Sequence, residues 1–248
     1  MKILNAAALQ EKPHAILFDL DDTLYAYHGP HERAMAAVRG KVQSSLKVTA
    51  AQFDEAFARA RKTVKAMLGQ TASAHNRLLY FSRMIEMLGL SSQPAIALDL
   101  EQTYWRTLLT TARLYPGAED MLIELRAAGL PLALVTDLTA QIQYRKLVYF
   151  GIDRYFDAIV TSEEAGVDKP GLRPFEIAAE KLGLTREERV WFVGDAACDV
   201  VASKQVLNAA TFQKVHDGGN HPLHDGVDAS FHNFIAFRDW ARGAIGQG

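Results

Sequence analysis

The chain has 248 residues, 49% of them hydrophobic and 23% charged, and this ordinary globular composition excludes disordered, collagen-like and low-complexity proteins. Its one cysteine, Cys198, excludes an internal disulfide framework, and the net charge of −2 does not favour nucleic acid as a partner. Because no apolar run approaches the roughly 20 residues that span a membrane, and residues 1–15 are a poor secretion signal, we expect a cytoplasmic protein that binds neither membranes nor nucleic acid.

The first predicted strand is the apolar run from His14 to Leu20, which leads into acidic residues. A long stretch with helical periodicity follows it. Start and stop signals, among them a capping box at Thr49, predict four helices in this stretch: Pro30 to about Leu46, Thr49 to about Leu68, Ser73 to Gly89, and Pro94 to about Thr111. Because the connections are short, the four helices are expected to form an antiparallel bundle.

From Tyr115 onward, short apolar runs alternate with helical patterns. The predicted strands are Leu130–Thr136, Ala158–Ser162, Val190–Gly194 and Ala209–Gln213. The predicted helices are Ala118–Ala128, Ala140–Phe150, Pro174–Leu182, Asp199–Val206 and Phe234–Ala241. Alternation at this spacing predicts the α/β class, with a Rossmann-like parallel sheet covered by helices on both faces. The all-helical bundle, residues 26–113, is then an insertion into a core formed by residues 1–25 and 114–248.

The charge is distributed unevenly between these two parts. Between His31 and Tyr115 there are twelve Lys and Arg residues against six Asp and Glu, whereas the remainder has fifteen against twenty-three. A basic excess in the inserted helices fits an anionic ligand. The alternative explanation for these numbers is chance variation in the charge of helix surfaces.

Polar residues suited to one reaction follow the predicted strands. In open parallel sheets, ligands bind at the carboxyl ends of the strands. In chain order the residues at these ends are Asp19 and Asp21, Thr136 and Asp137, Lys169, and Asp195 with Asp199 four residues on. Charges that serve only solubility belong on helix surfaces instead, so this concentration predicts an active site.

The sequence Asp-Leu-Asp-Asp-Thr from Asp19, a strand ending in Thr136, a Lys-Pro pair at Lys169 and Gly-Asp-x-x-x-Asp from Gly194 resemble the motifs of the haloacid dehalogenase superfamily, in its phosphatase branch. All four motifs occur in order across essentially the whole chain. The inserted helices stand where that superfamily has a helical cap of the C1 type. Residues 136–169 further resemble nucleotidases and N-acylneuraminate-9-phosphate phosphatases.

This resemblance implies that Asp19 is the nucleophile, which attacks phosphorus and forms an aspartyl-phosphate intermediate. It also implies Mg²⁺ as the cofactor, held by Asp19, the backbone carbonyl of Asp21, and Asp195, with Asp199 as an outer or alternative ligand. Thr136 and Lys169 are implied to act in catalysis and, together with Asp137, to bind the phosphate.

Asp21 separates two activities of the superfamily. A carboxyl group two residues after the nucleophile can protonate the leaving oxygen and later deprotonate water. Halide leaves without a proton, so Asp21 favours a phosphatase over a dehalogenase. Two positions depart from the branch: Asp137 stands where Asn is common, and Asp22 stands where Gly is common.

We therefore predict a Mg²⁺-dependent phosphomonoesterase that acts on a small phosphorylated metabolite, such as a sugar phosphate or a nucleotide. A phosphomutase, a haloacid dehalogenase and a non-catalytic binding protein are the alternatives, and the oligomeric state is open. Cys198 is expected to be a packing residue, and the histidines of the segment 216–226 are expected to belong to a polar surface loop. Arg33, Arg77, Arg83 and Arg106 of the inserted helices are the arginines considered as candidates to face the substrate.

Overall fold

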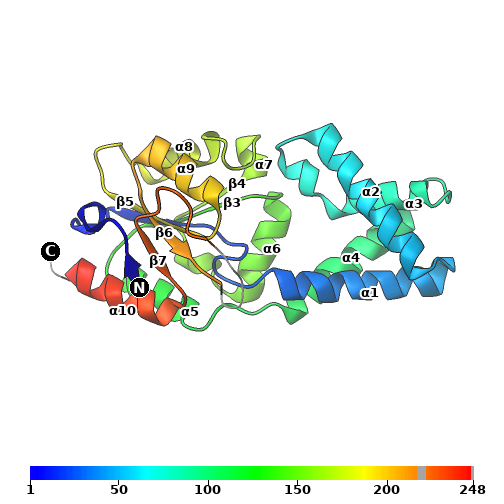
Figure 1. Ribbon diagram of the computed structural model, residues 1–248, viewed down its shortest axis with the longest axis horizontal. Coiled ribbons are helices and arrows are strands. Elements are labelled where there is room, and N and C mark those ends of the chain that lie inside the picture. The colour runs from blue at the N-terminus through cyan, green and yellow to red at the C-terminus, as the bar shows by residue number, and fades with distance from the viewer. Residues whose placement is uncertain (217–221, 247–248) are drawn as a thin grey trace. The chain divides into compact units, whose positions relative to one another are not determined.

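The chain divides into two units, which the computed structural model describes over residues 1–216 and 222–246. The core unit consists of residues 1–26 and 113–248, and the helical unit consists of residues 27–112 (Figure 1). Among the described residues, no helix combines the length and the apolar character that crossing a membrane requires.

The described part of the core unit contains a sheet of seven strands in the order β1-β7-β6-β5-β2-β3-β4. The strands are β1 (Lys2–Ile3), β2 (Ala15–Phe18), β3 (Leu132–Thr136), β4 (Ala158–Thr161), β5 (Val190–Gly194), β6 (Ala210–Lys214) and β7 (Ala229–Phe231). The pair β1–β7 is antiparallel, and the other neighbours are parallel, which confirms the predicted α/β class. Because the chain continues from β2 to β3 on one side and later returns to β5 on the other, the strand order reverses at β2, which is where ligands bind in such sheets.

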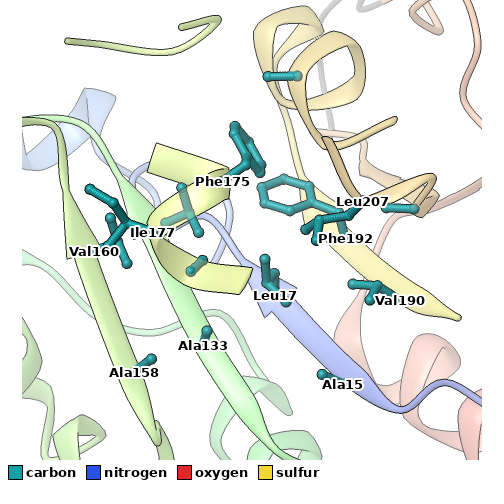
Figure 2. Packing of buried hydrophobic residues seen from close by; sticks show 14 residues of the cluster. Ala15, Leu17, Ala133, Ala158, Val160, Phe175, Ile177, Val190, Phe192 and Leu207 are labelled. Carbon is teal, nitrogen blue, oxygen red and sulfur yellow. The ribbon is translucent and has the colours of Figure 1, made fainter. Parts of the chain in front are cut away.

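Helices cover both faces of this sheet. They are α5 (Ala118–Ala127), α6 (Ala140–Phe150), α7 (Ser162–Ala165), α8 (Arg173–Leu182), α9 (Ala197–Leu207) and α10 (Phe234–Gly246), with short 3-10 turns at Ala6–Leu9 and Asp153–Tyr155. On one face, Phe175 and Ile177 of α8 and Leu207 of α9 pack on alternate residues of the strands (Figure 2). On the other face, Trp240 of α10 packs against Trp191 of β5, with ring centroids 5.2 Å apart.

Burial on both faces explains why the strands read as continuous apolar runs. All four residues of β2 are fully buried, as are Phe175 and the ring of Trp191. Fully burying a large apolar side chain contributes about 1.5–3 kcal/mol to the stability of the folded chain. Because β2 is packed on both faces, its position in the core is firmly held, and so is the start of the first motif, which directly follows it.

The helical unit contains the four predicted helices: α1 (His28–Leu46), α2 (Ala50–Leu68), α3 (Arg77–Met87) and α4 (Pro94–Thr111), with a 3-10 turn at Ala72–His75. Within the unit, α1 packs against α4, α2 against α3, and α3 against α4. The capping box of Thr49 with Gln52 forms as expected. These contacts place the apolar faces of the helices against one another.

Some boundaries differ from those predicted. Ser73 does not cap the third helix, because it lies in the 3-10 turn; the cap is Asn76, whose side chain accepts the backbone N–H groups of Leu78 and Leu79 at 2.9 and 3.3 Å. The strands β1 and β7 were not predicted, since segments of two and three residues show no periodicity. The last helix continues beyond Ala241 to Gly246.

A polar cluster lies inside the helical unit. Arg77 donates to the hydroxyl of Tyr27 at 2.5 Å, and its guanidinium lies 5.2 Å from the ring centroid of Tyr104. The hydroxyl of Tyr104 lies 2.6 Å from Nδ1 of His31. Burial, followed by the charges of nearby cations, among them Arg77, lowers the pKa of His31 to about 4. His31 is therefore neutral in the folded chain at neutral pH.

This pKa makes the stability of the chain depend on pH. The unfolded chain binds the His31 proton with the ordinary pKa of 6.5, more tightly than the folded chain does. Neutral His31 therefore makes its full contribution to the free energy of unfolding above about pH 6.5. This contribution is lost as the pH falls from there toward about 4. In urea unfolding followed by circular dichroism, we expect His31→Gln to lose less stability than the parent between about pH 7 and about pH 5. The exposed His14 supplies the control variant, His14→Gln, and an unchanged pH dependence in His31→Gln would contradict the prediction.

Candidate active site

Asp19 directly follows β2 and points into a buried charged cluster. Its side chain is 8% exposed, and that of Lys169 is 4% exposed. Nζ of Lys169 donates to Oδ1 of Asp19 and to Oδ1 of Asp199, both at 2.7 Å. It also donates to the carbonyl of Val135 in β3 at 3.2 Å. One lysine therefore connects the first, third and fourth predicted motifs.

Three carboxylates converge in this cluster. Asp19, Asp195 after β5 and Asp199 in the first turn of α9 each offer an oxygen, and these oxygens all lie within 4.8 Å of one another. The hydroxyl of Thr23 lies 3.2 Å from an oxygen of Asp19 and 3.2 Å from one of Asp195. A side chain at Gly194 would place its Cβ 2.3 Å from Oδ2 of Asp199, so only glycine permits this approach. Carboxylate oxygens are the ligands that Mg²⁺ prefers.

The electrostatics of the cluster favour an added cation. Burial, together with the neighbouring charges of Asp199 and Asp195, raises the pKa of Asp19 well above its ordinary value, against the attraction of Lys169. Burial likewise raises the pKa of Asp199. Burial by itself would lower the pKa of Lys169, but Asp19, Asp199 and Asp137 raise it well above its ordinary value. The lysine is thus charged and does not balance the carboxylates alone, so the donor set fits a divalent cation.

Asp21 lies beside the cluster and is held by three donors. Nζ of Lys146 in α6 lies 2.6 and 2.8 Å from its two oxygens, Nε2 of Gln143 donates to it at 3.0 Å, and the hydroxyl of Tyr25 donates as well. Burial by itself would raise the pKa of Asp21, but Lys146 and these hydrogen bonds hold it below its ordinary value. Asp21 is therefore ionised in this arrangement.

Thr136 ends β3, and Asp137 follows it. Thr136 is buried, and its hydroxyl accepts from Nε2 of Gln143 at 2.5 Å. Oδ1 of Asp137 accepts the backbone N–H of Lys169 at 3.0 Å, so its carboxylate orients the loop that carries the lysine. Burial raises the pKa of Asp137, and the positive charge of Lys169 opposes this increase.

Asp22, which stands where Gly is common in the phosphatase branch, has a backbone conformation that suits glycine. Its φ is 59°, in the left-handed region that Gly adopts freely and that Asp tolerates better than most residues.

Several residues of the site were missed by the sequence analysis. Lys146 and Gln143 lie on α6 among the buried positions Ile142 and Leu147, and a Lys and a Gln at buried helix positions are the signal that points to them. Thr23, inside the first motif, is also fully buried.

Two histidines of the expected surface loop contact Asp195. Nε2 of His224 donates to the carbonyl of Asp195 at 2.9 Å, and Nε2 of His216 lies 3.6 Å from its Oδ2. His221, the third histidine of the expected loop, lies outside the described residues. Cys198 is half-buried, and burial, with the charge of Asp199, raises the pKa of its thiol to about 12, which fits a packing residue.

The core is therefore a mostly parallel α/β sheet with an acidic cluster at the carboxyl ends of its central strands. Residues 13–206 match the haloacid dehalogenase-like hydrolase family, and the chain belongs to that family.

Two curated relatives indicate the type of hydrolase within this family. The chain is 35% identical over 193 residues to a ribulose-1,5-bisphosphate 5-phosphatase from Halopiger xanaduensis, covering 77% of this chain and 81% of the relative. It is also 35% identical over 181 residues to a glyceraldehyde 3-phosphate phosphatase from Methanocaldococcus jannaschii, covering 73% of this chain and 75% of the relative. These similarities place the chain among the phosphatases of the family.

Solved structures agree on the fold. A HAD phosphatase from Thermococcus onnurineus superimposes with a TM-score of 0.67 at 22% identity, covering 91% of this chain and 96% of that one. A 2-haloacid dehalogenase from Pseudomonas syringae pv. Tomato superimposes with a TM-score of 0.68 at 20% identity, covering 93% and 99%. Because the two neighbours are named for different reactions, the likeness of fold does not separate phosphatase from dehalogenase chemistry.

Proposed function

We propose that this protein is a Mg²⁺-dependent phosphomonoesterase that hydrolyses a small phosphorylated sugar, with Asp19 as its nucleophile. The observation that carries the proposal is the convergence of Asp19, Asp195 and Asp199 around Lys169, with Asp21 two residues beyond the nucleophile. A dehalogenase has no use for a second acid at that position, because halide leaves without a proton.

The reaction has two steps. In the first, an oxygen of Asp19 attacks phosphorus and the bond from phosphorus to the sugar oxygen breaks. This oxygen takes up a proton from Asp21, which is ionised before substrate binds and accepts that proton from solvent. In the second, water attacks the aspartyl phosphate, Asp21 takes a proton from that water, and inorganic phosphate leaves with Asp19 restored. General acid–base help of this kind is typically worth about 10²–10⁴ in rate.

The other residues hold the reacting groups. Asp19, Asp195 and the backbone carbonyl of Asp21 are the proposed metal ligands, with Asp199 as an outer or alternative ligand. Bound Mg²⁺ supplies positive charge that offsets the repulsion between a carboxylate and a phosphate dianion. Thr136 and Lys169 bind the phosphoryl oxygens. Asp137 takes part indirectly, since its carboxylate orients the backbone of Lys169.

The names of the relatives support the substrate class. Relatives that match about three quarters of the chain are named for glyceraldehyde 3-phosphate and for ribulose 1,5-bisphosphate, which are both small phosphorylated sugars. We therefore propose a sugar phosphate rather than a nucleotide. The inserted helices, residues 26–113, are proposed to act as the cap that selects the organic part of the substrate, and residues 1–25 and 114–248 as the catalytic core.

The test is release of inorganic phosphate from a panel of glyceraldehyde 3-phosphate, ribulose 1,5-bisphosphate and nucleoside monophosphates. With Mg²⁺ we expect release from at least one sugar phosphate. Removing the metal with a chelator is expected to lower the rate by about 100-fold or more, and excess Mg²⁺ to restore it, because a bound metal supplies several kcal/mol of charge stabilisation. Absence of phosphate release from every ester would contradict the proposal. Isomerisation of a sugar phosphate without phosphate release would indicate a mutase instead, and metal-independent chloride release from 2-chloropropionate a dehalogenase.

A further inference from the structure

An arginine without a carboxylate partner lies inside the helical unit. Arg77, the first residue of α3, donates to the carbonyl of His75 at 2.7 Å and to the hydroxyl of Tyr27 at 2.5 Å. Its Nε is buried and has no hydrogen-bond partner among the described residues, and in that part of the chain no carboxylate forms an ion pair with it. Burying a cation without a counter-charge costs free energy. The stability of the helices alone is therefore a poor reason for this arginine.

Aromatic rings surround the guanidinium of Arg77. It lies 5.4 Å from the ring centroid of Tyr80, 5.2 Å from that of Tyr104 and 5.8 Å from that of Trp105. These three residues are buried, whereas Arg77 is only half-buried. The rings hold the guanidinium in place through cation–π contacts and leave part of the residue open to solvent. An arginine held in this way is a preformed fork for an oxyanion, because little side-chain freedom remains to be lost when the anion binds.

Hydroxyl and imidazole groups lie beside this arginine. The hydroxyl of Tyr27 lies 2.8 Å from that of Tyr104, which in turn lies 2.6 Å from Nδ1 of His31. Tyr27 and His31 are half-buried, so these groups are not sealed from solvent. Such groups can donate to the oxygens of an anion or bind the hydroxyl groups of a sugar. All of them belong to α1, α3 and α4 or directly precede α1, so the cluster lies within one unit (Figure 1).

The charge around the cluster is positive. Burial, followed by the charges of Arg77 and Arg61, lowers the pKa of His31 to about 4. Arg61 belongs to α2 and is exposed. Two cations match a phosphate monoester, whose charge is about −1.5 to −2 at pH 7, better than they match a carboxylate. The cluster therefore fits a phosphate group.

We propose that Arg77, together with the hydroxyls of Tyr27 and Tyr104, forms a phosphate-binding site within the helical unit, made of other residues than those proposed to bind the transferred phosphoryl group. Its ligand is either a second phosphate of the substrate or free inorganic phosphate. In the first case the inference rests on the proposed phosphatase function and narrows the substrates to sugar bisphosphates.

Trp105 is a local reporter of this site, because the other two tryptophans, Trp191 and Trp240, belong to the core unit. The experiment is ¹⁹F NMR of the full chain labelled with 5-fluorotryptophan, in which Trp105→Phe assigns the signal. Inorganic phosphate is added in the presence of a chelator, with chloride at equal ionic strength as the reference. We expect phosphate, and not chloride, to shift the Trp105 signal to saturation.

The variant Arg77→Met is expected to raise the apparent Kd for phosphate by at least about tenfold, because a charge-assisted hydrogen-bonded pair is lost. Absence of a saturable shift in the parent would overturn the inference. An unchanged Kd in Arg77→Met would also overturn it, since phosphate bound elsewhere in the chain would then cause the shift.

Two further variants complete this experiment. Arg83→Met removes an exposed arginine of the same helix, one that pairs with Glu86 at 2.7 Å, and is expected to bind phosphate as the parent does. If Arg77→Met does not fold, Arg77→Lys keeps the charge without the planar fork and is expected to weaken binding by about tenfold. An unchanged Kd in Arg77→Lys would then overturn the inference.

Kinetics distinguish the two sources of the phosphate group. If it is the second phosphate of the substrate, we expect Arg77→Met to raise KM for ribulose 1,5-bisphosphate by about tenfold or more, and KM for glyceraldehyde 3-phosphate by less than about threefold. If it is free inorganic phosphate, KM changes for neither ester. Because the NMR shift needs neither metal nor turnover, a chain that hydrolyses no ester still tests this site. Failure of the proposed function and failure of this inference are therefore separate results.

Discussion

Replacing Asp19 with Asn is expected to lower kcat for phosphate release by at least about 10³-fold, because removal of a nucleophile leaves only the contribution of binding and charge stabilisation. The amide oxygen of Asn is a far weaker nucleophile than a carboxylate, and the acidic cluster also loses one of its three charges. Inorganic phosphate released from a sugar phosphate in the presence of Mg²⁺ is the measurement.

The same variant also tests the covalent step. After a rapid acid quench with ³²P-labelled substrate, the parent is expected to carry label on the protein, and Asp19→Asn is expected to carry none. Asp120→Asn, an exposed carboxylate in the first turn of α5, makes the same chemical change away from the site and is the control. Turnover in Asp19→Asn equal to that of the parent would refute the assignment of the nucleophile.

Lys169→Met is expected to reduce both activity and stability. The lysine is the hydrogen-bond partner that Asp19 and Asp199 share, and all three side chains are buried. Removing one partner of a buried ion pair leaves uncompensated charge and costs about 3–5 kcal/mol. Loss of a cation that stabilises a transferring phosphoryl group is expected to lower kcat by about 10²–10³-fold. Urea unfolding and phosphate release measure the two effects.

A double variant separates these two roles of Lys169. Adding Asp199→Asn to Lys169→Met removes the negative charge left behind, so we expect part of the lost stability to return while activity stays low. Lys12→Met, at an exposed position, is the control for removing a lysine. Full recovery of activity in the double variant would mean that Lys169 serves only to balance charge, and unchanged stability in Lys169→Met would contradict the buried pairing.

Residues that follow predicted strands were accessible to sequence reasoning, whereas Lys146 and Gln143 on α6 were not. Asp19, Thr136 and Asp195 stand out because each follows a short apolar run, and parallel strands bring such ends together at one edge of the sheet. Lys146 has no such marker. Its partner Asp21 lies 125 residues away, and helical periodicity in one sequence does not reveal which distant residue a buried lysine meets.

Competing helix caps and very short strands explain where the structure differs from the elements predicted from the sequence. Ser73 and Asn76 both suit a helix start, and the choice between them depends on the 3-10 turn that precedes α3. The strand β1 has two residues and, among the described strands, pairs with β7 alone, so its formation depends on a partner more than 200 residues away. The contacts of His216 and His224 with Asp195 likewise depend on where the chain returns after β6.

The order of the strands has a consequence during synthesis. The proposed nucleophile Asp19 is synthesised well before the central strand β2 obtains its neighbour β5, which is complete only at residue 194, and the carboxylates of Asp195 and Asp199 follow later still. Until residue 169 has been made, the nascent chain therefore contains an aspartate that lacks both its lysine and its acidic neighbours. Since domains generally fold as units, an unfinished chain of this protein is not expected to act prematurely on the metabolites around it.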